Sequence, residues 1–106
     1  MIKHIVLWKL KDEANGNSRL DNALRLKQEL ESLNGIIPGM LLLEVGVNIK
    51  DSESGKDDSD VILYSEFKNI ESLENYYLHP KHIKIKPFAK SIRSERRVIN
   101  YQVGSI

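Results

Sequence analysis

The side chains of this sequence best suited to chemistry gather in one short segment. Tyr76 and Tyr77 are adjacent, and His79 and His82 follow, three residues apart. Histidine titrates near neutral pH and a tyrosine hydroxyl donates a hydrogen bond without ionising, so the segment has the residue types for acid–base chemistry. A structural role is the alternative, because a buried histidine is often only a hydrogen-bonded core group and one of two adjacent tyrosines must face the core. For Tyr77 we favour the core.

Imidazole is also a common metal ligand, so the histidines raise the possibility of a metal site. Pro80 lies between His79 and His82, so their rings need not share a helical face, and we expect no metal. A second group of candidate ligands is the acidic stretch that contains Asp51, Glu53, Asp57, Asp58 and Asp60. It lacks a full calcium-loop pattern, which favours a solvated loop.

The region after His82 is locally basic. Seven cationic residues, opposed only by Glu95, lie between residues 81 and 97: Lys81, Lys84, Lys86, Lys90, Arg93, Arg96 and Arg97. We expect such a region to be a solvated surface, or to attract a small anionic molecule near His82. Nucleic acid is not an expected partner, because the formal net charge is only +1 and aromatic residues are not interleaved with the basic ones.

The elements that must position these residues follow from hydrophobic periodicity. A two-residue alternation predicts strands over residues 2–10, 41–49, 61–67 and about 96–103. Three- and four-residue spacing predicts helices over residues 20–33 and 70–77, capped by Ser18 and Asn69. Pro80 ends the second helix and can begin a further helical segment, with a kink or break at Pro87. Residues 12–17 and 50–60 are predicted to be loops, the second a mobile hairpin loop.

This β-α-β-β-α-β order predicts an antiparallel four-stranded sheet of the ferredoxin-like α+β class. The first and third strands are apolar on both faces, so they belong in the centre, as the spatial order fourth, first, third, second requires. Two helices can cover only one side. The other side then exposes Ile5, Leu7, Ile62 and Tyr64, or their opposite neighbours, as an apolar patch. Sheet-to-sheet packing of two copies would bury it, so we predict a homodimer.

Composition limits the alternatives. With 106 residues, 41% hydrophobic and 29% charged, the chain fits a single domain over residues 1–106, with no membrane partner. The absence of cysteine excludes disulfides and thiolate chemistry and suits a reducing compartment. Because the first ten residues lack an export signal, we expect a cytoplasmic protein.

Three motifs of the sequence resemble signatures of a known family. They are IKHIVLWKLK at residues 2–11, IPG at residues 37–39 and YYLHPKH at residues 76–82. They are similar to those of the stress-responsive A/B barrel domain (Dabb) family, within the dimeric α+β barrel superfamily, and the resemblance covers almost the whole chain. It implies that two ferredoxin-like halves close their sheets into a barrel.

The resemblance also suggests roles for individual residues. The best-understood chemistry in the family is that of the plant polyketide cyclase that makes olivetolic acid by an aldol condensation without a cofactor. By motif match, His82 corresponds to its catalytic histidine, Tyr76 to its catalytic tyrosine and His4 to a pocket histidine. His82 would then be the base and Tyr76 the orienting donor. His4 would either hold the tautomer of His82 or bind a substrate oxygen.

Two further residues, Trp8 and His79, are expected to contact the ligand, and no cofactor is expected. The chain departs from the cyclase after His82, where residues 83–87 are bulky and basic in place of small glycine-containing residues. The cyclase's substrate therefore does not carry over.

Two main hypotheses for function remain. We favour a non-catalytic homodimeric barrel that binds a small organic ligand. The alternative is a cofactor-independent cyclase or lyase acting on a polyketide-like or β-dicarbonyl compound, with His82 and Tyr76 as the working pair. A third reading takes the superfamily's cofactor-free monooxygenases as the model, which is an argument from fold alone.

Overall fold

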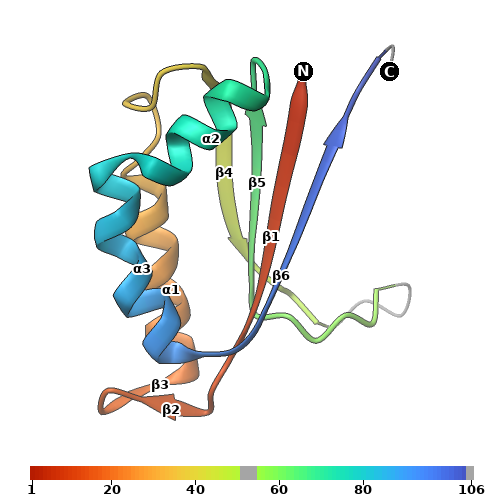
Figure 1. Cartoon of the computed structure of the whole chain (residues 1–106). Helices are drawn as coiled ribbons and strands as arrows, with labels where there is room; N and C mark the ends of the chain where they lie inside the picture. Colours follow the sequence, from red (N-terminus) through yellow and green to blue (C-terminus); the bar gives the residue numbers. More distant parts are fainter. Residues whose placement is uncertain (51–54, 105–106) are drawn as a thin grey trace.

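The computed structural model describes residues 1–50 and 55–104, and its main feature is a four-stranded antiparallel sheet with all helices on one side (Figure 1). The strands of this sheet are β1 (Ile2–Leu10), β4 (Met40–Val47), β5 (Val61–Phe67) and β6 (Arg93–Gln102). The helices are α1 (Arg19–Glu31), α2 (Ile70–Leu78) and α3 (Pro80–Ile92). The strand order β4-β5-β1-β6 confirms the predicted ferredoxin-like topology, with the first and third main strands in the centre.

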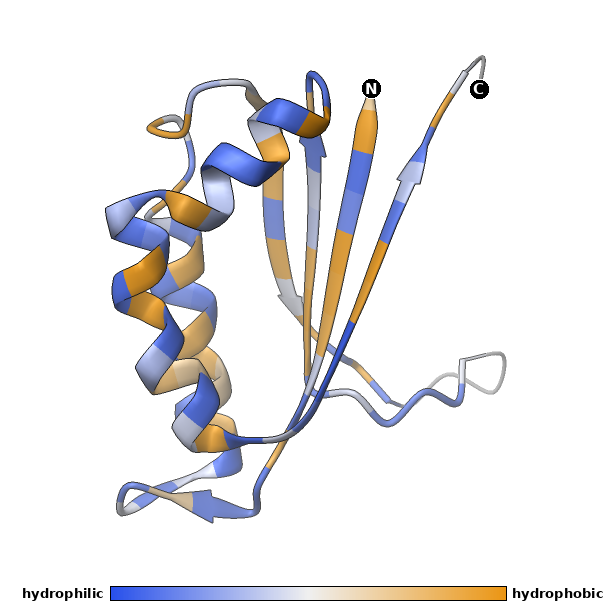
Figure 2. Ribbon diagram, in the orientation of Figure 1, coloured by the Kyte–Doolittle hydropathy of each residue, from blue (hydrophilic) through white to orange (hydrophobic). Residues whose placement is uncertain are grey.

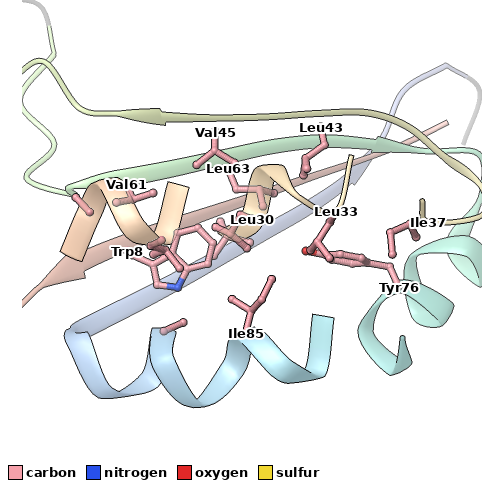
Figure 3. Packing of buried hydrophobic residues seen from close by; sticks show 14 of the residues in the cluster. Trp8, Leu30, Leu33, Ile37, Leu43, Val45, Val61, Leu63, Tyr76 and Ile85 are labelled. Atoms are coloured by element: carbon pink, nitrogen blue, oxygen red, sulfur yellow. The ribbon is translucent and has the colours of Figure 1, made fainter. Parts of the chain in front are cut away.

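The covered face of the sheet carries the core. Along β1 the residues alternate between buried and half-buried, and Val6, Trp8 and Leu10 are among those buried against the helices. Figure 3 shows this cluster between the sheet and the helices. It includes Leu26, Leu30, Leu33, Leu63, Phe67, Tyr76, Ile85 and Ile92. Burying each large side chain contributes about 1.5–3 kcal/mol, so this layer holds the helices to the sheet.

The uncovered face has the apolar residues that the alternation predicts. Ile5 pairs with Tyr64 on β5 and with Ile99 on β6, and Leu7 pairs with Ile62. No helix of the described chain covers these side chains, and Ile99 is 50% exposed. In Figure 2 hydrophobic colour runs along most of β1, although only one of its faces meets the helices.

The start of α1 differs from the prediction. Ser18 caps the helix as expected, with its Oγ accepting from the Asp21 amide at 3.1 Å. Leu20 and Leu24, however, are 59% and 50% exposed, so the apolar stripe is narrower than predicted. Asn22 is buried instead, because its amide donates to the carbonyls of the loop before the helix.

That loop is itself ordered by pairing. Residues 12–17 were expected to form an irregular loop, but β2 (Glu13–Ala14) and β3 (Asn17–Ser18) pair as a small hairpin. Its turn is Asn15-Gly16, with φ of 55° and 78°. Asparagine followed by glycine is the pair that tight hairpin turns favour, so the signal was present in the sequence.

The predicted strand 41–49 is shifted at both ends. An irregularity between Met40 and Leu42 changes the alternation, so Leu41 is 54% exposed and not in the core. Ile49 is 76% exposed and lies beyond the end of β4 at Val47. A bulge places two residues of one strand opposite one of its partner, which a simple two-residue count cannot reveal.

The junction between α2 and α3 places the tyrosines and histidines. Asn69 caps α2 through its Oδ1, which accepts from the Ser72 amide at 2.9 Å. Gly39 lies against this turn, where a Cβ would collide with the Ser72 side chain.

α2 ends before His79 and Pro80 begins α3, as expected. Of the kink or break predicted at Pro87, the break is wrong, since α3 runs through this exposed residue to Ile92.

The acidic stretch is only partly described, since Asp51 and Glu53 lie outside the described residues. Its remaining carboxylates are paired with cations. Asp57 contacts Arg97, Asp58 contacts Lys9 at 2.7 Å, and the buried Asp60 accepts from Lys50 at 2.6 Å. Asp57 and Asp58 therefore tie the loop to β6 and β1, and Asp60 also accepts from the Leu10 amide of β1 at 2.7 Å. Within residues 1–50 and 55–104, no helix is long and apolar enough to cross a membrane.

Candidate functional site

A cavity of about 320 Å³ lies between α3 and the β1–β6 side of the sheet. Its lining comprises Trp8, Leu30, Tyr77, His82, Ile85, Lys86, Ala89, Lys90, Arg93 and Arg96. Most of these residues come from α3 and its end, at the three- and four-residue spacing that defines one face of a helix. Trp8 and Arg96 are opposite each other in the β1–β6 ladder, so one cross-strand pair forms the sheet side.

His82 lies in this cavity as an uncharged imidazole. Its side chain is mostly buried, with a residue exposure of 8%. The pKa of His82 is lowered to about 4, mainly by burial; a hydrogen bond to a carbonyl opposes this shift, and the nearby cations Lys86 and Arg96 add to it. That bond joins Nδ1 to the carbonyl oxygen of Tyr77 at 3.4 Å. Since a carbonyl only accepts, Nδ1 carries the proton and Nε2 keeps its lone pair.

The structure puts Tyr76, and not Tyr77, in the core position that the sequence favoured for Tyr77. Tyr76 is the core residue, 2% exposed, and Figure 3 shows its hydroxyl pointing into the hydrophobic cluster. Its ring lies 4.3 Å from that of His82, and burial raises its pKa. Tyr77, which we expected in the core, lines the cavity. The reason is the turn at His79, which brings α3 and His82 back beside the last turn of α2.

His4 is buried behind Tyr77 and does not line the cavity. Its Nδ1 donates to Oδ1 of Asn100 at 2.6 Å, and its Nε2 lies 3.2 Å from the Tyr77 hydroxyl. Burial lowers its pKa, so the ring is neutral and Nε2 accepts from that hydroxyl. No hydrogen bond joins His4 to His82 in the described chain. The tautomer of His82 is instead set by the Tyr77 carbonyl.

Trp8 presents a free donor. The residue is 4% exposed and lines the cavity, and its Nε1–H has no hydrogen-bond partner among the described residues. In Figure 3 the indole nitrogen is on the side of the ring that faces α3. Because an unpaired buried donor costs about 1–3 kcal/mol, this N–H favours a ligand oxygen or a water molecule as its acceptor.

Four cations surround the cavity without paired anions. They are Lys86, Lys90, Arg93 and Arg96. In the described part of the chain none of them lies within salt-bridge distance of a carboxylate, whereas Arg97, at the end of the basic run, contacts Asp57. Lys86 places its Nζ 5.9 Å from the Tyr77 ring centre. Like charges held together without counter-ions attract an anion from solution.

His79 is placed away from this group. It does not line the cavity, and its Nδ1 accepts the Lys81 amide at 3.1 Å, so the ring caps α3. Within the described ranges, no three histidine, aspartate or glutamate side chains come together as a metal site.

A second depression of about 430 Å³ is larger but chemically different. It is lined by residues of the hairpin, α1, the end of β4 and the segment between β4 and β5, among them Arg19, Leu20, Lys50 and Asp60. Its charges are already paired, because Arg19 contacts Asp12 and Lys50 contacts Asp60. The cavity beside His82 is therefore the better candidate site.

Comparison with known proteins agrees with this architecture. The sequence model of one protein family, the stress responsive A/B barrel domain (Dabb), matches residues 2–103 of this chain. The chain belongs to the Dabb family. Its curated relative DABB1 of Arabidopsis thaliana, a stress-response A/B barrel domain-containing protein, is 24% identical over 101 residues. The match covers 95% of this chain but 46% of that protein, so the chain spans less than half of its length.

Solved structures place the Dabb chain among dimeric ferredoxin-like proteins. One from Bacteroides fragilis, a dimeric protein of unknown function, is 29% identical with a TM-score of 0.81, covering 95% of this chain and 94% of its own. A hydroxynitrile lyase from Passiflora edulis is 18% identical with a TM-score of 0.75, covering 99% and 94%. At that identity the lyase shows a shared fold and leaves the reaction open.

The lowered pKa of His82 predicts that the free energy of unfolding depends on pH. In the unfolded chain its pKa is near 6.5, and in the folded chain about 4. Between these values the unfolded chain binds more protons, so the free energy of unfolding falls as the pH is lowered from 6.5 to 4. We expect His82 to account for about 3 kcal/mol of that loss.

Urea unfolding followed by Trp8 fluorescence between pH 7 and pH 4 measures this effect. In His82→Gln the fall in the free energy of unfolding between pH 7 and pH 4 should be smaller by the contribution of His82. Some slope should remain in the variant, because burial also lowers the pKa of His4. Equal slopes for the two proteins would show that His82 is not held uncharged by burial.

Proposed function

We propose that this Dabb chain binds a small organic anion in the cavity beside His82. The observation that carries the proposal is the convergence of Lys86, Lys90, Arg93 and Arg96 on one cavity with no carboxylate partner among the described residues. The remaining lining is aromatic and apolar, including Trp8 and Ile85, which suits an organic body attached to the anionic group.

The protein that binds this ligand is proposed to be a homodimer formed by sheet-to-sheet packing. The apolar residues Ile5, Leu7 and Ile62 lie on the face without helices. Two charges of the central strands are already paired there, since Tyr64 donates to Glu66 at 2.6 Å and Lys3 lies 3.5 Å from the same carboxylate. Burying this pair costs less than burying a lone charge, and the exposed Glu44 of the edge strand β4, opposite Tyr64, would stay at the solvated rim. The composition favours a reducing compartment, and we propose the cytoplasm.

Catalysis by His82 is a second candidate function, favoured by its free Nε2 beside four cations. A neutral imidazole could take a proton from a carbon next to a carbonyl, and the cations would stabilise the enolate that results. Tyr76 was expected to orient the carbonyl, but its hydroxyl does not line the cavity. The unpartnered Nε1–H of Trp8 is better placed for that role. This proposal retains the cofactor-independent cyclase or lyase chemistry with a different orienting donor.

Binding can be followed with the fluorescence of Trp8, the single tryptophan of the chain. We expect benzoate to change this fluorescence with saturation, and benzamide, which has the same shape without the charge, to bind at least about tenfold more weakly. Substitutions Lys86→Ala and Arg96→Ala should each weaken benzoate by about three- to tenfold, as expected for a charge-assisted contact.

The matched control is Lys84→Ala, which removes a cation of the same helix that does not line the cavity. Equal affinities for benzoate and benzamide, or an equal effect of the Lys84 and Lys86 substitutions, would refute binding of the anion by these cations.

Catalysis is tested by deuterium exchange. If His82 is a base, the protein should accelerate exchange at C2 of ethyl acetoacetate in D₂O, followed by NMR, and His82→Gln should reduce the acceleration by about 100-fold or more. The control His79→Asn alters a histidine outside the cavity and keeps a good helix cap. Equal acceleration by wild type and His82→Gln would exclude His82 as the base, while leaving anion binding in place.

A further inference from the structure

Three polar side chains form a hydrogen-bonded chain from the cavity wall to β6. The Tyr77 hydroxyl lies 3.2 Å from Nε2 of His4, and Nδ1 of His4 lies 2.6 Å from Oδ1 of Asn100. His4 is 1% exposed, so water does not compete for its nitrogens. Its ring also packs edge-on against the Tyr77 ring, with centres 5.4 Å apart.

The direction of each hydrogen bond follows from the end of this chain. The amide oxygen of Asn100 can only accept, so Nδ1 of His4 must carry the proton. A neutral His4 then has a lone pair at Nε2, and Tyr77 must donate its hydroxyl proton to it. The Tyr77 oxygen is left with lone pairs and no proton to offer a ligand.

We infer that Asn100 and His4 are positioning residues that make the Tyr77 hydroxyl a hydrogen-bond acceptor, and that the cavity selects organic anions carrying a hydroxyl or N–H donor. The inference rests on the proposed anion binding, which supplies the cations for one end of the ligand. Tyr77 supplies the contact for the other end. Helix α3 sets the separation between the cationic contact and the Tyr77 contact, because it holds Nζ of Lys86 at 5.9 Å from the Tyr77 ring centre.

The expected selectivity can be measured with a matched set of anions. Wild type should bind 4-hydroxybenzoate and 4-aminobenzoate about three- to tenfold more tightly than 4-methoxybenzoate, in line with one neutral hydrogen bond. Tyr77→Phe should bind all three with similar affinity. In Asn100→Leu the proton of His4 is free to move to Nε2 and donate to Tyr77, so the preference should fall or reverse. Tyr101→Phe, which removes a hydroxyl from the opposite face of the sheet, is the control.

The tautomer of His4 gives a readout that needs no ligand. ¹⁵N NMR of the histidine side chains should show Nδ1 protonated and Nε2 unprotonated in wild type, and a shift toward protonated Nε2 in Asn100→Leu. A wild-type His4 protonated at Nε2, or equal affinities for 4-hydroxybenzoate and 4-methoxybenzoate, would overturn this inference. Either result would leave the proposed anion binding intact. If none of the three anions bound, the proposed anion site would be refuted and the selectivity with it.

Discussion

The structure depends on one constraint, namely that its helices cover only one face of the sheet. The buried cluster of Val6, Trp8 and Leu63 holds α1, α2 and α3 on that side. The central strands β1 and β5 also carry apolar side chains on the opposite face, because successive residues of a strand point to opposite faces of the sheet. One sheet therefore supplies both the wall of the cavity and the apolar face that we propose to pack against a second copy.

The edge position of β6 explains why the cavity is charged. Val98, on the helix side of β6, is 38% exposed, so the helices leave this part of the sheet incompletely covered. The cations at the end of α3 and the start of β6 thus border the space around His82 and remain in contact with solvent. Lys86, Lys90 and Arg96 are exposed there, whereas burial lowers the pKa of His82. The site therefore combines an exposed cationic rim with a buried imidazole.

Sequence reasoning reached the topology because it rests on the alternation along β1 and β5, which is local. It also singled out His82 and the basic segment, four of whose cations line the same cavity as His82. It misplaced Tyr77, because the orientation of a helix depends on what it packs against, and local spacing cannot choose which of two adjacent residues faces the core. It missed Asn100, whose role follows from its register opposite His4 in the β1–β6 ladder, a pairing of residues 96 positions apart. The hairpin at residues 13–18, by contrast, was signalled by its turn.

The most direct test of this account is the assembly state, measured by sedimentation equilibrium at micromolar concentration. Wild type should sediment as a dimer, and Leu7→Glu, which places a carboxylate on the uncovered face, as a folded monomer. Leu24→Glu makes the same change at a position on α1 that is 50% exposed, and it should remain dimeric. A wild-type protein that sedimented as a stable monomer, or a Leu7→Glu variant that stayed dimeric, would contradict the claim that the open face is sealed by a second copy.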